Sequence, residues 1–112
     1  MTQPSAEQPL DVLHHIALAV DDIQQSVDWY TQNFHCRVVY QDETWALVEL
    51  ANLHLAFVSR DQHPAHIGFV RPDAERFGRL KPHRDGTRSV YVQDPSGNAV
   101  EILAENSLSP GP

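Results

Sequence analysis

The sequence has one cysteine, few basic residues and no long hydrophobic run. Because Cys36 has no partner within the chain, an internal disulfide and a thiolate metal cage are excluded, and a reducing compartment is expected. Eight Lys and Arg residues against 15 Asp and Glu give a net charge of -7, which disfavours nucleic acid and anionic lipid as partners. No apolar stretch approaches the roughly 18 residues of a membrane span, and residues 1–9 lack a signal-peptide pattern. We therefore expect a cytoplasmic protein that binds a small molecule.

The length of 112 residues and the hydrophobic content of 41% suit a single compact domain. Both ends are polar and rich in Pro, Ser and Gly, so flexible tails are expected at residues 1–9 and 106–112. The folded domain is predicted over residues 13–105, with a first unit at about 13–59 and a second at about 65–105.

The first unit has the pattern of a βαβββ element. Ile23, Val27, Tyr30 and Phe34 recur at helical spacing, and Asp21 with Gln24 is predicted to cap that helix. Strands are predicted at residues 13–20, 37–41, 45–50 and 53–58.

The second unit repeats this order in shortened form. Pro72 opens a brief predicted helix that ends near Leu80, and strands are expected at 67–70, 89–93 and 99–104. The segment from Lys81 to Thr87 is too polar and too interrupted by Pro and Gly to predict a strand. The fold class is therefore α+β, with two βαβββ-type units, the second one shortened.

Three residues with metal-binding side chains lie in separate apolar runs. His15 and His66 begin two related phrases, His-Ile-Ala-Leu-Ala-Val-Asp-Asp and His-Ile-Gly-Phe-Val-Arg-Pro-Asp, and Glu101 lies in the last predicted strand. Two imidazoles and one carboxylate form a facial ligand set that leaves positions open for a substrate. Any one of seven histidines is more often a surface or core residue than a ligand, so the prediction depends on the repeat.

The alternation of residues along the strands predicts where these side chains point. His15 shares its face with Ala17 and Ala19, and His66 shares its face with Gly68, while the bulky residues fall on the other face. Small neighbours leave room for a cavity inside a curved, partly open mixed sheet. His14 falls on the opposite face from His15 and is expected at the surface.

Together these motifs resemble the vicinal oxygen chelate superfamily, which includes glyoxalases, bleomycin-resistance proteins, extradiol dioxygenases and fosfomycin-resistance transferases. The resemblance runs from Leu13 to Leu103, and its most specific part is Asp-Pro-Ser-Gly-Asn followed by Ala-Val-Glu-Ile. It implies a divalent ion (Fe, Mn, Zn, Ni or Co) held by His15, His66 and Glu101. It also implies Lewis-acid chemistry on vicinal oxygens, and a homodimer.

Particular subfamilies are matched only in part. Glyoxalases have a glutamate ligand on the strand corresponding to residues 53–58, where the only metal-capable side chain here is His54, a fourth ligand or a residue lining the substrate pocket. Lys81, Ser89 and Tyr91 fall where fosfomycin-resistance transferases bind phosphonate. Asp85 stands where that family has a second serine, which weakens the match.

The cationic residues concentrate in the second unit, and this favours an anionic substrate. Lys81, Arg84 and Arg88 lie near the last two predicted strands, where a guanidinium could clamp a carboxylate or phosphate, and Arg88 is the leading candidate. Tyr91 is predicted to donate a proton or to form part of the pocket wall. A solvated helix face would explain the same charges.

Two functions of different classes are compatible with these features. The first is a metal-dependent lyase, isomerase, transferase or dioxygenase acting on a small oxygen-rich, anionic substrate. The second is a metal-free drug-binding protein of the bleomycin-resistance type, in which Trp29 or Trp45 would stack on a cationic drug. The predicted ligand set favours the enzyme.

Overall fold

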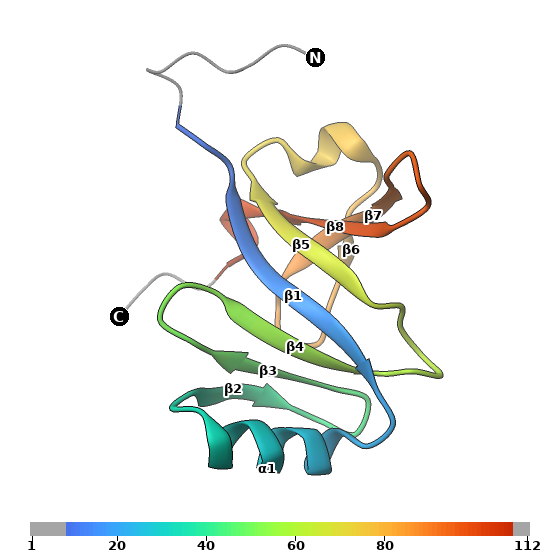
Figure 1. Ribbon diagram of the computed structural model, residues 1–112. Coiled ribbons are helices and arrows are strands. Elements are labelled where there is room, and N and C mark those ends of the chain that lie inside the picture. Colours follow the sequence, from blue (N-terminus) through green and yellow to red (C-terminus); the bar gives the residue numbers. More distant parts are fainter. Residues whose placement is uncertain (1–8, 109–112) are drawn as a thin grey trace.

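The computed structural model describes residues 9–108, which form one mixed sheet of eight strands, one α-helix and two short 3₁₀-helices (Figure 1). The strands are β1 Val12–Val20, β2 Arg37–Gln41, β3 Trp45–Glu49, β4 His54–Ser59, β5 His66–Arg71, β6 Lys81–Pro82, β7 Arg88–Gln93 and β8 Ala99–Ala104. The helices are α1 Ile23–Asn33, η1 Ala74–Phe77 and η2 Glu105–Ser107. Within the described part of the chain, no helix has the length and apolar character needed to cross a membrane.

The strand order confirms the two-unit architecture predicted from the sequence. It runs β2-β3-β4-β1-β5-β8-β7-β6, so that the first unit, β1 to β4 with α1, is matched by the second, β5 to β8 with η1. In each unit the first strand pairs in parallel with the fourth, β1 with β4 and β5 with β8. The two units join where β1 and β5 pair in antiparallel fashion. The predicted α+β fold of paired βαβββ units is therefore correct.

The first unit has a helix-covered core. Ile23 and Val27 of α1 are buried against Ala46, Val48 and Phe57 of β3 and β4. Other details of the predicted helix differ. Asp22 rather than Asp21 caps it, accepting the backbone N–H of Gln25 at 2.8 Å, while Asp21 pairs with Arg60. Phe34 follows the helix and is exposed.

The second unit departs from its prediction in two places. The helix expected from Pro72 to Leu80 is only the single turn η1, because it ends at Gly78, whose φ of 149° falls outside helical geometry. The loop expected between Leu80 and Arg88 contains the two-residue strand β6, in which Lys81 pairs with Ser89 and Pro82 with Arg88. The short strand escaped prediction because its pairing is supplied by β7, not by a local hydrophobic pattern.

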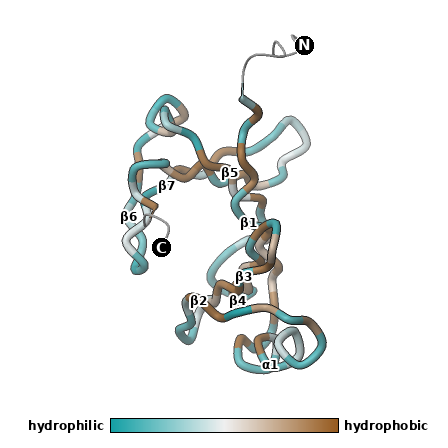
Figure 2. Tube along the Cα trace, turned by 90° about the vertical axis from the view of Figure 1, so that its left-hand side faces the viewer, coloured by the Kyte–Doolittle hydropathy of each residue, from teal (hydrophilic) through white to brown (hydrophobic). Residues whose placement is uncertain are grey.

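The sheet curls into a half-barrel. Figure 2 shows it curving from β2 at one end to β6 at the other, with β1 and β5 between them. Small residues on the concave face, including Ala17 and Ala56, leave space there, as the alternation of side chains predicted.

The predicted flexible tails fall largely outside the described residues. Within the predicted C-terminal tail, η2 is ordered by Ser107, whose Oγ accepts the backbone N–H of Arg88 at 2.9 Å.

Candidate metal centre

The three predicted metal ligands meet on the concave face of the sheet. The strand register brings them together: His15 of β1 lies opposite Gly68 of β5, and Gly68 lies opposite Glu101 of β8. His66 is two residues from Gly68 and so shares its face. Gly68 has no side chain, and a Cβ at this position would overlap the ring of His15. The glycine therefore provides the space in which the His15 ring lies.

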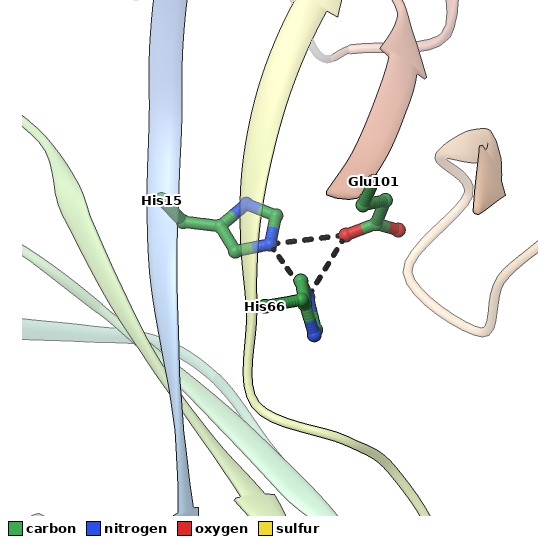
Figure 3. A group of neighbouring side chains, drawn as sticks. All are labelled: His15, His66 and Glu101. Carbon is green, nitrogen blue, oxygen red and sulfur yellow. Dashed lines mark hydrogen bonds and ion pairs between the residues drawn. The ribbon is translucent and has the colours of Figure 1, made fainter. Parts of the chain in front are cut away.

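The ligand atoms form a small triangle (Figure 3). His15 Nε2 lies 3.1 Å from His66 Nε2 and 3.0 Å from Glu101 Oε1, and His66 Nε2 lies 3.2 Å from the same oxygen. All three side chains are buried. Two nitrogens and a carboxylate oxygen thus converge on one point.

Hydrogen bonds orient both imidazoles. The Nδ1–H of His66 donates to the carbonyl oxygen of Pro64 at 2.9 Å, which leaves Nε2 as an unprotonated acceptor in the neutral ring. Nδ1 of His15 lies 2.8 Å from Nδ1 of His14, so that one ring donates to the other. When His15 is the donor, its Nε2 also carries a free lone pair. A neighbouring acceptor of this kind fixes the tautomer of a metal-binding histidine.

The carboxylate of Glu101 is held from its far side. Ser89 Oγ–H donates to Oε2 at 2.6 Å, and Nε2 of His83 lies 3.3 Å from the same oxygen and 2.6 Å from Ser89 Oγ. Burial opposes ionisation of Glu101, but hydrogen bonds from His15, His66 and His83 outweigh it when the ring nitrogens that face the carboxylate carry protons, and the pKa of Glu101 then lies well below its ordinary value. The hydrogen bond to Glu101 raises the pKa of His83 in turn. Glu101 is therefore an oriented, ionised carboxylate.

His14 lies beside the site, contrary to the prediction that it would face the other way. The pairing of β1 with β5 shifts register between Leu13 and His15, so that His14 is an extra residue in a bulge and the alternation of faces breaks. The ring of His14 stacks on that of His54, with centroids 4.7 Å apart. Burial, and the nearby His15 and His54, lower the pKa of His14 to about 4, so the ring is neutral at physiological pH.

A cavity of about 220 Å³ opens in front of the three side chains. One side of it carries the ligand triangle and Tyr91, and the loop between β6 and β7 contributes His83, Arg84 and Asp85. Apolar side chains form a second part of the lining, namely Trp45, Leu47, Ala56, Val58 and Leu103, and the remaining lining residues are His14, His63, Pro82 and Thr87. The cavity is below the roughly 300–1,000 Å³ of sites for drug-sized molecules, which indicates a small ligand.

Of the other predicted site residues, Tyr91 lines the cavity. Its hydroxyl lies 3.5 Å from His66 Nε2, and the two rings meet edge to face. Burial and the charge of Glu101 raise the pKa of Tyr91, so the phenol keeps its proton. Ser89 is buried behind Glu101 and holds that carboxylate instead of facing the cavity.

Lys81, Arg88 and His54 are not among the residues that line the cavity. Arg88 neighbours Ser89 on β7 and so points to the other face, where it donates to Asn106 Oδ1 at 2.8 Å. Lys81 is exposed on β6, and His54 packs on His14. The predicted substrate-binding roles of these three residues are therefore not supported by their positions.

The sequence analysis missed His83, which lies on the polar loop where no strand was predicted. Arg84 on the same loop was considered as a clamp for an anionic ligand, and it does line the cavity. The duplication contained the relevant signal. If the second unit repeats the first, a strand must pair with Ser89, and the loop that follows it must return toward the cavity.

Comparisons with known proteins now place this chain. A family model described as the Glyoxalase/Bleomycin resistance protein/Dioxygenase superfamily matches residues 12–78, more than half of the sequence. The chain belongs to this superfamily. The resemblance seen in the sequence is thereby confirmed, and the matched segment includes two of the three candidate ligands, His15 and His66. A search of curated proteins finds no match.

Solved structures share the superfamily fold. A superfamily member from Vibrio splendidus 12B01 aligns at a TM-score of 0.60 and 13% identity, covering 84% of this chain and 97% of its own. A protein from Legionella pneumophila, named as an NAD-dependent benzaldehyde dehydrogenase, aligns at a TM-score of 0.58 and 13% identity. The alignment covers 80% of this chain and 96% of that protein. Lactoylglutathione lyase from Agrobacterium tumefaciens aligns at a TM-score of 0.46 and 21% identity. The alignment covers 85% of this chain and 94% of the lyase. The first two alignments, with TM-scores above 0.5, show a shared fold and do not extend to the reaction.

Proposed function

We propose that this protein is a metal-dependent enzyme in which His15, His66 and Glu101 hold one divalent ion. The observation that carries the proposal is the buried triangle of ligand atoms, 3.0 to 3.2 Å apart, at the wall of a cavity. Ligand atoms about 2.1 Å from an ion and at right angles to one another lie roughly 3 Å apart, so the triangle fits a facial site.

The donor chemistry supports the same conclusion. In the tautomers with Nδ1 protonated, lone pairs on two imidazole nitrogens and a carboxylate converge in a buried place, and a cation that replaces the protons between them would offset their mutual repulsion. Each ligand is also held from behind, by Pro64, His14 or Ser89. Iron, manganese, zinc, nickel and cobalt all accept two imidazoles and a carboxylate.

When bound, the ion would act as a Lewis acid toward vicinal oxygens of a small substrate. The protein's own side chains would orient that substrate. Tyr91 Oη, beside His66, is placed to donate a hydrogen bond to a substrate oxygen, and the apolar wall of Trp45, Leu47 and Val58 would exclude water. Any negative charge on the substrate would lie on the chelating oxygens, because Lys81 and Arg88 are outside the cavity. The reaction class stays open among lyase, isomerase, transferase and dioxygenase.

Metal binding tests this proposal. Protein purified without chelator and then incubated with each of the five ions should retain close to one equivalent, measured by elemental analysis. His66→Ala should weaken binding at least about 100-fold in calorimetry, because one of three protein ligands is lost. His35→Ala is the matched control, since His35 is exposed and outside the cavity, and it should bind as the wild type does.

Two results would contradict the proposal of a metal-dependent enzyme. One is retention of less than about 0.1 equivalent of every ion, and the other is equal binding by His66→Ala and the wild type. If the same protein bound a bleomycin-type drug unchanged after His15→Ala, the metal-free binder would replace the enzyme as the proposed function.

We also propose a homodimer, which the family resemblance implies, and a cytoplasmic location. Sedimentation at micromolar concentration should show a species of twice 12.6 kDa. A 12.6 kDa species alone would reject the dimer.

A further inference from the structure

The wall of the cavity opposite the candidate metal ligands is apolar and comes from the first unit. Trp45 and Leu47 of β3 and Val58 of β4 pack with the small residues Ala17 and Ala56. Val58 and Ala56 are almost fully buried. A ligand that places two oxygens toward His15, His66 and Glu101 therefore has this apolar wall beside its remaining atoms.

Trp45 is held in place before any ligand arrives. Its ring stacks on that of Tyr40, with centroids 4.2 Å apart and an angle of 22° between the planes. Its backbone N–H donates to Asp42 Oδ1 at 3.0 Å, and the N–H of Thr44 donates to the same oxygen at 2.7 Å. The turn before β3 therefore orders the tryptophan.

The same turn engages the one Lys or Arg side chain that lines the cavity within residues 9–108. Arg84 Nη1 lies 3.0 Å from Asp42 Oδ2, and Nη2 donates to Thr44 Oγ1 at 2.6 Å. The guanidinium of Arg84 is thus paired with residues of the first unit. The next residue on the loop, Asp85, adds a carboxylate to the cavity lining. Nε2 of His83 likewise lies 3.3 Å from Oε2 of Glu101 and 2.6 Å from Oγ of Ser89. A distal anion on a ligand would find no unpaired cation here.

We propose that this cavity selects ligands whose group distal to the chelating oxygens is uncharged and apolar, and that it rejects a distal anion. Trp45 is the specificity-determining residue. Asp42 is a positioning residue, which acts by holding Trp45 and by keeping Arg84 away from the ligand. This inference rests on the proposed metal site and names the class of substrate for it.

Hydroxamic acids provide a test because they chelate metals through the same two oxygens whatever group they carry. We would load the protein with Zn²⁺ and measure the affinities of acetohydroxamic, benzohydroxamic and 4-carboxybenzohydroxamic acid by calorimetry. The wild type should bind the benzo probe at least about 10-fold tighter than the acetyl probe, as expected for burying a ring, and about 10-fold tighter than the carboxylated probe.

Substitutions should change these ratios in different ways. Trp45→Ala should bring the benzo-to-acetyl ratio close to one. Val58→Thr, a substitution of nearly equal volume, should lower the ratio by about threefold and covers the case in which Trp45→Ala fails to fold. Asp42→Asn should release Arg84 and raise the affinity for the carboxylated probe about 10-fold relative to the affinity for the benzo probe. A general loosening of the fold would weaken both probes and would not favour the carboxylated one.

The control is Trp29→Ala, which removes an exposed tryptophan of α1 outside the cavity and should leave every ratio unchanged. Binding of all three probes with equal affinity would overturn the inference while leaving the metal site intact. Failure of the wild type to retain Zn²⁺, or of every probe to bind the Zn²⁺-loaded protein, would overturn the proposed function and this inference together.

Discussion

The two halves of this sheet have the same strand order but different contents. The first unit covers its outer face with the 11-residue helix α1, and Phe57 at the centre of its core is fully buried. The second has only the four-residue turn η1 over Ile102, and Ile67 and Phe77 stay exposed. Duplication has therefore preserved backbone pairing but not the packing above it.

The polar side chains of the candidate site follow the opposite distribution. Two of the three metal ligands, His66 and Glu101, belong to the second unit, as do Ser89, His83 and Tyr91. The first unit contributes His15 and most of the apolar wall. The unit with the smaller core thus carries most of the buried ionisable groups. We infer that the first unit supplies most of the folding stability and the second most of the chemistry.

The largest difference between the units should appear in their cores. Phe57→Ala should lower the free energy of unfolding by about 4 kcal/mol, because it removes a fully buried ring that also contacts Tyr30. Ile102→Ala should cost about 2 kcal/mol, since a single 3₁₀ turn can settle into the space more easily than a long helix. Urea unfolding of both variants measures these costs. Equal losses would remove the asymmetry on which this comparison depends.

The next effect concerns the junction of the two units at Gly68. Gly68→Ala should displace the His15 ring and weaken metal binding by about 100-fold, because the added Cβ would overlap ring atoms. Gly97→Ala is the control: Gly97 has a positive φ of 85° with no atom near its Cβ position, so that variant should lose about 1 kcal/mol of stability while keeping its metal affinity. Unaltered affinity in Gly68→Ala would show that the His15 ring has room to move.

The smallest effect should come from the carboxylate of Asp42, which accepts hydrogen bonds within the first unit and also pairs with Arg84 of the second. Burial raises the pKa of Asp42, but hydrogen bonds from Tyr40 and from the backbone of Thr44 and Trp45 prevail and lower it to about 2. Because the pKa is depressed in the folded state, this stabilisation is present above pH 4 and is lost as the pH falls toward 2. Solvent exposure of the pair limits it to about 1 kcal/mol.

Asp42→Asn, which retains a hydrogen-bond acceptor, should therefore be about 1 kcal/mol less stable than the wild type at pH 7 and equally stable near pH 2. Thermal unfolding across this pH range checks the difference. Asp21→Asn, which disrupts only the exposed pair with Arg60, should show almost no change with pH. A wild-type advantage that persisted at pH 2 would mean that the Asp42 carboxylate does not contribute through its charge.

Much of the fold could be predicted because hydrophobic alternation and helical spacing are local signals. They predicted most strands of both units, and they placed His15 with Ala17 and Ala19 on the concave face. Where the prediction failed, a longer-range contact decided the outcome. The β6 pairing depends on β7, and Asp21 pairs with Arg60, 39 residues away, while Asp22 caps the helix.

The candidate site shows the same division. The repeated phrase around His15 and His66 and the motif before Glu101 pointed to the three ligands without any structure. Lys81 and Arg88 were plausible from charge alone, but charge does not report which face of a strand a residue occupies. The contacts that His83 and Arg84 make could not be predicted from local patterns, because their partners, Glu101 and Asp42, lie 18 and 42 positions away along the chain.

The amino-acid sequence by itself determined the duplicated architecture and the three residues that could hold an ion, because both are encoded in periodic patterns within short segments. Tertiary structure alone decided that a bulge brings His14 to the site and that Gly68 leaves space for His15. It also decided that Arg84 is held by Asp42. These outcomes depend on strand register and on distances between segments, and such quantities arise only when the chain has closed its long-range pairings.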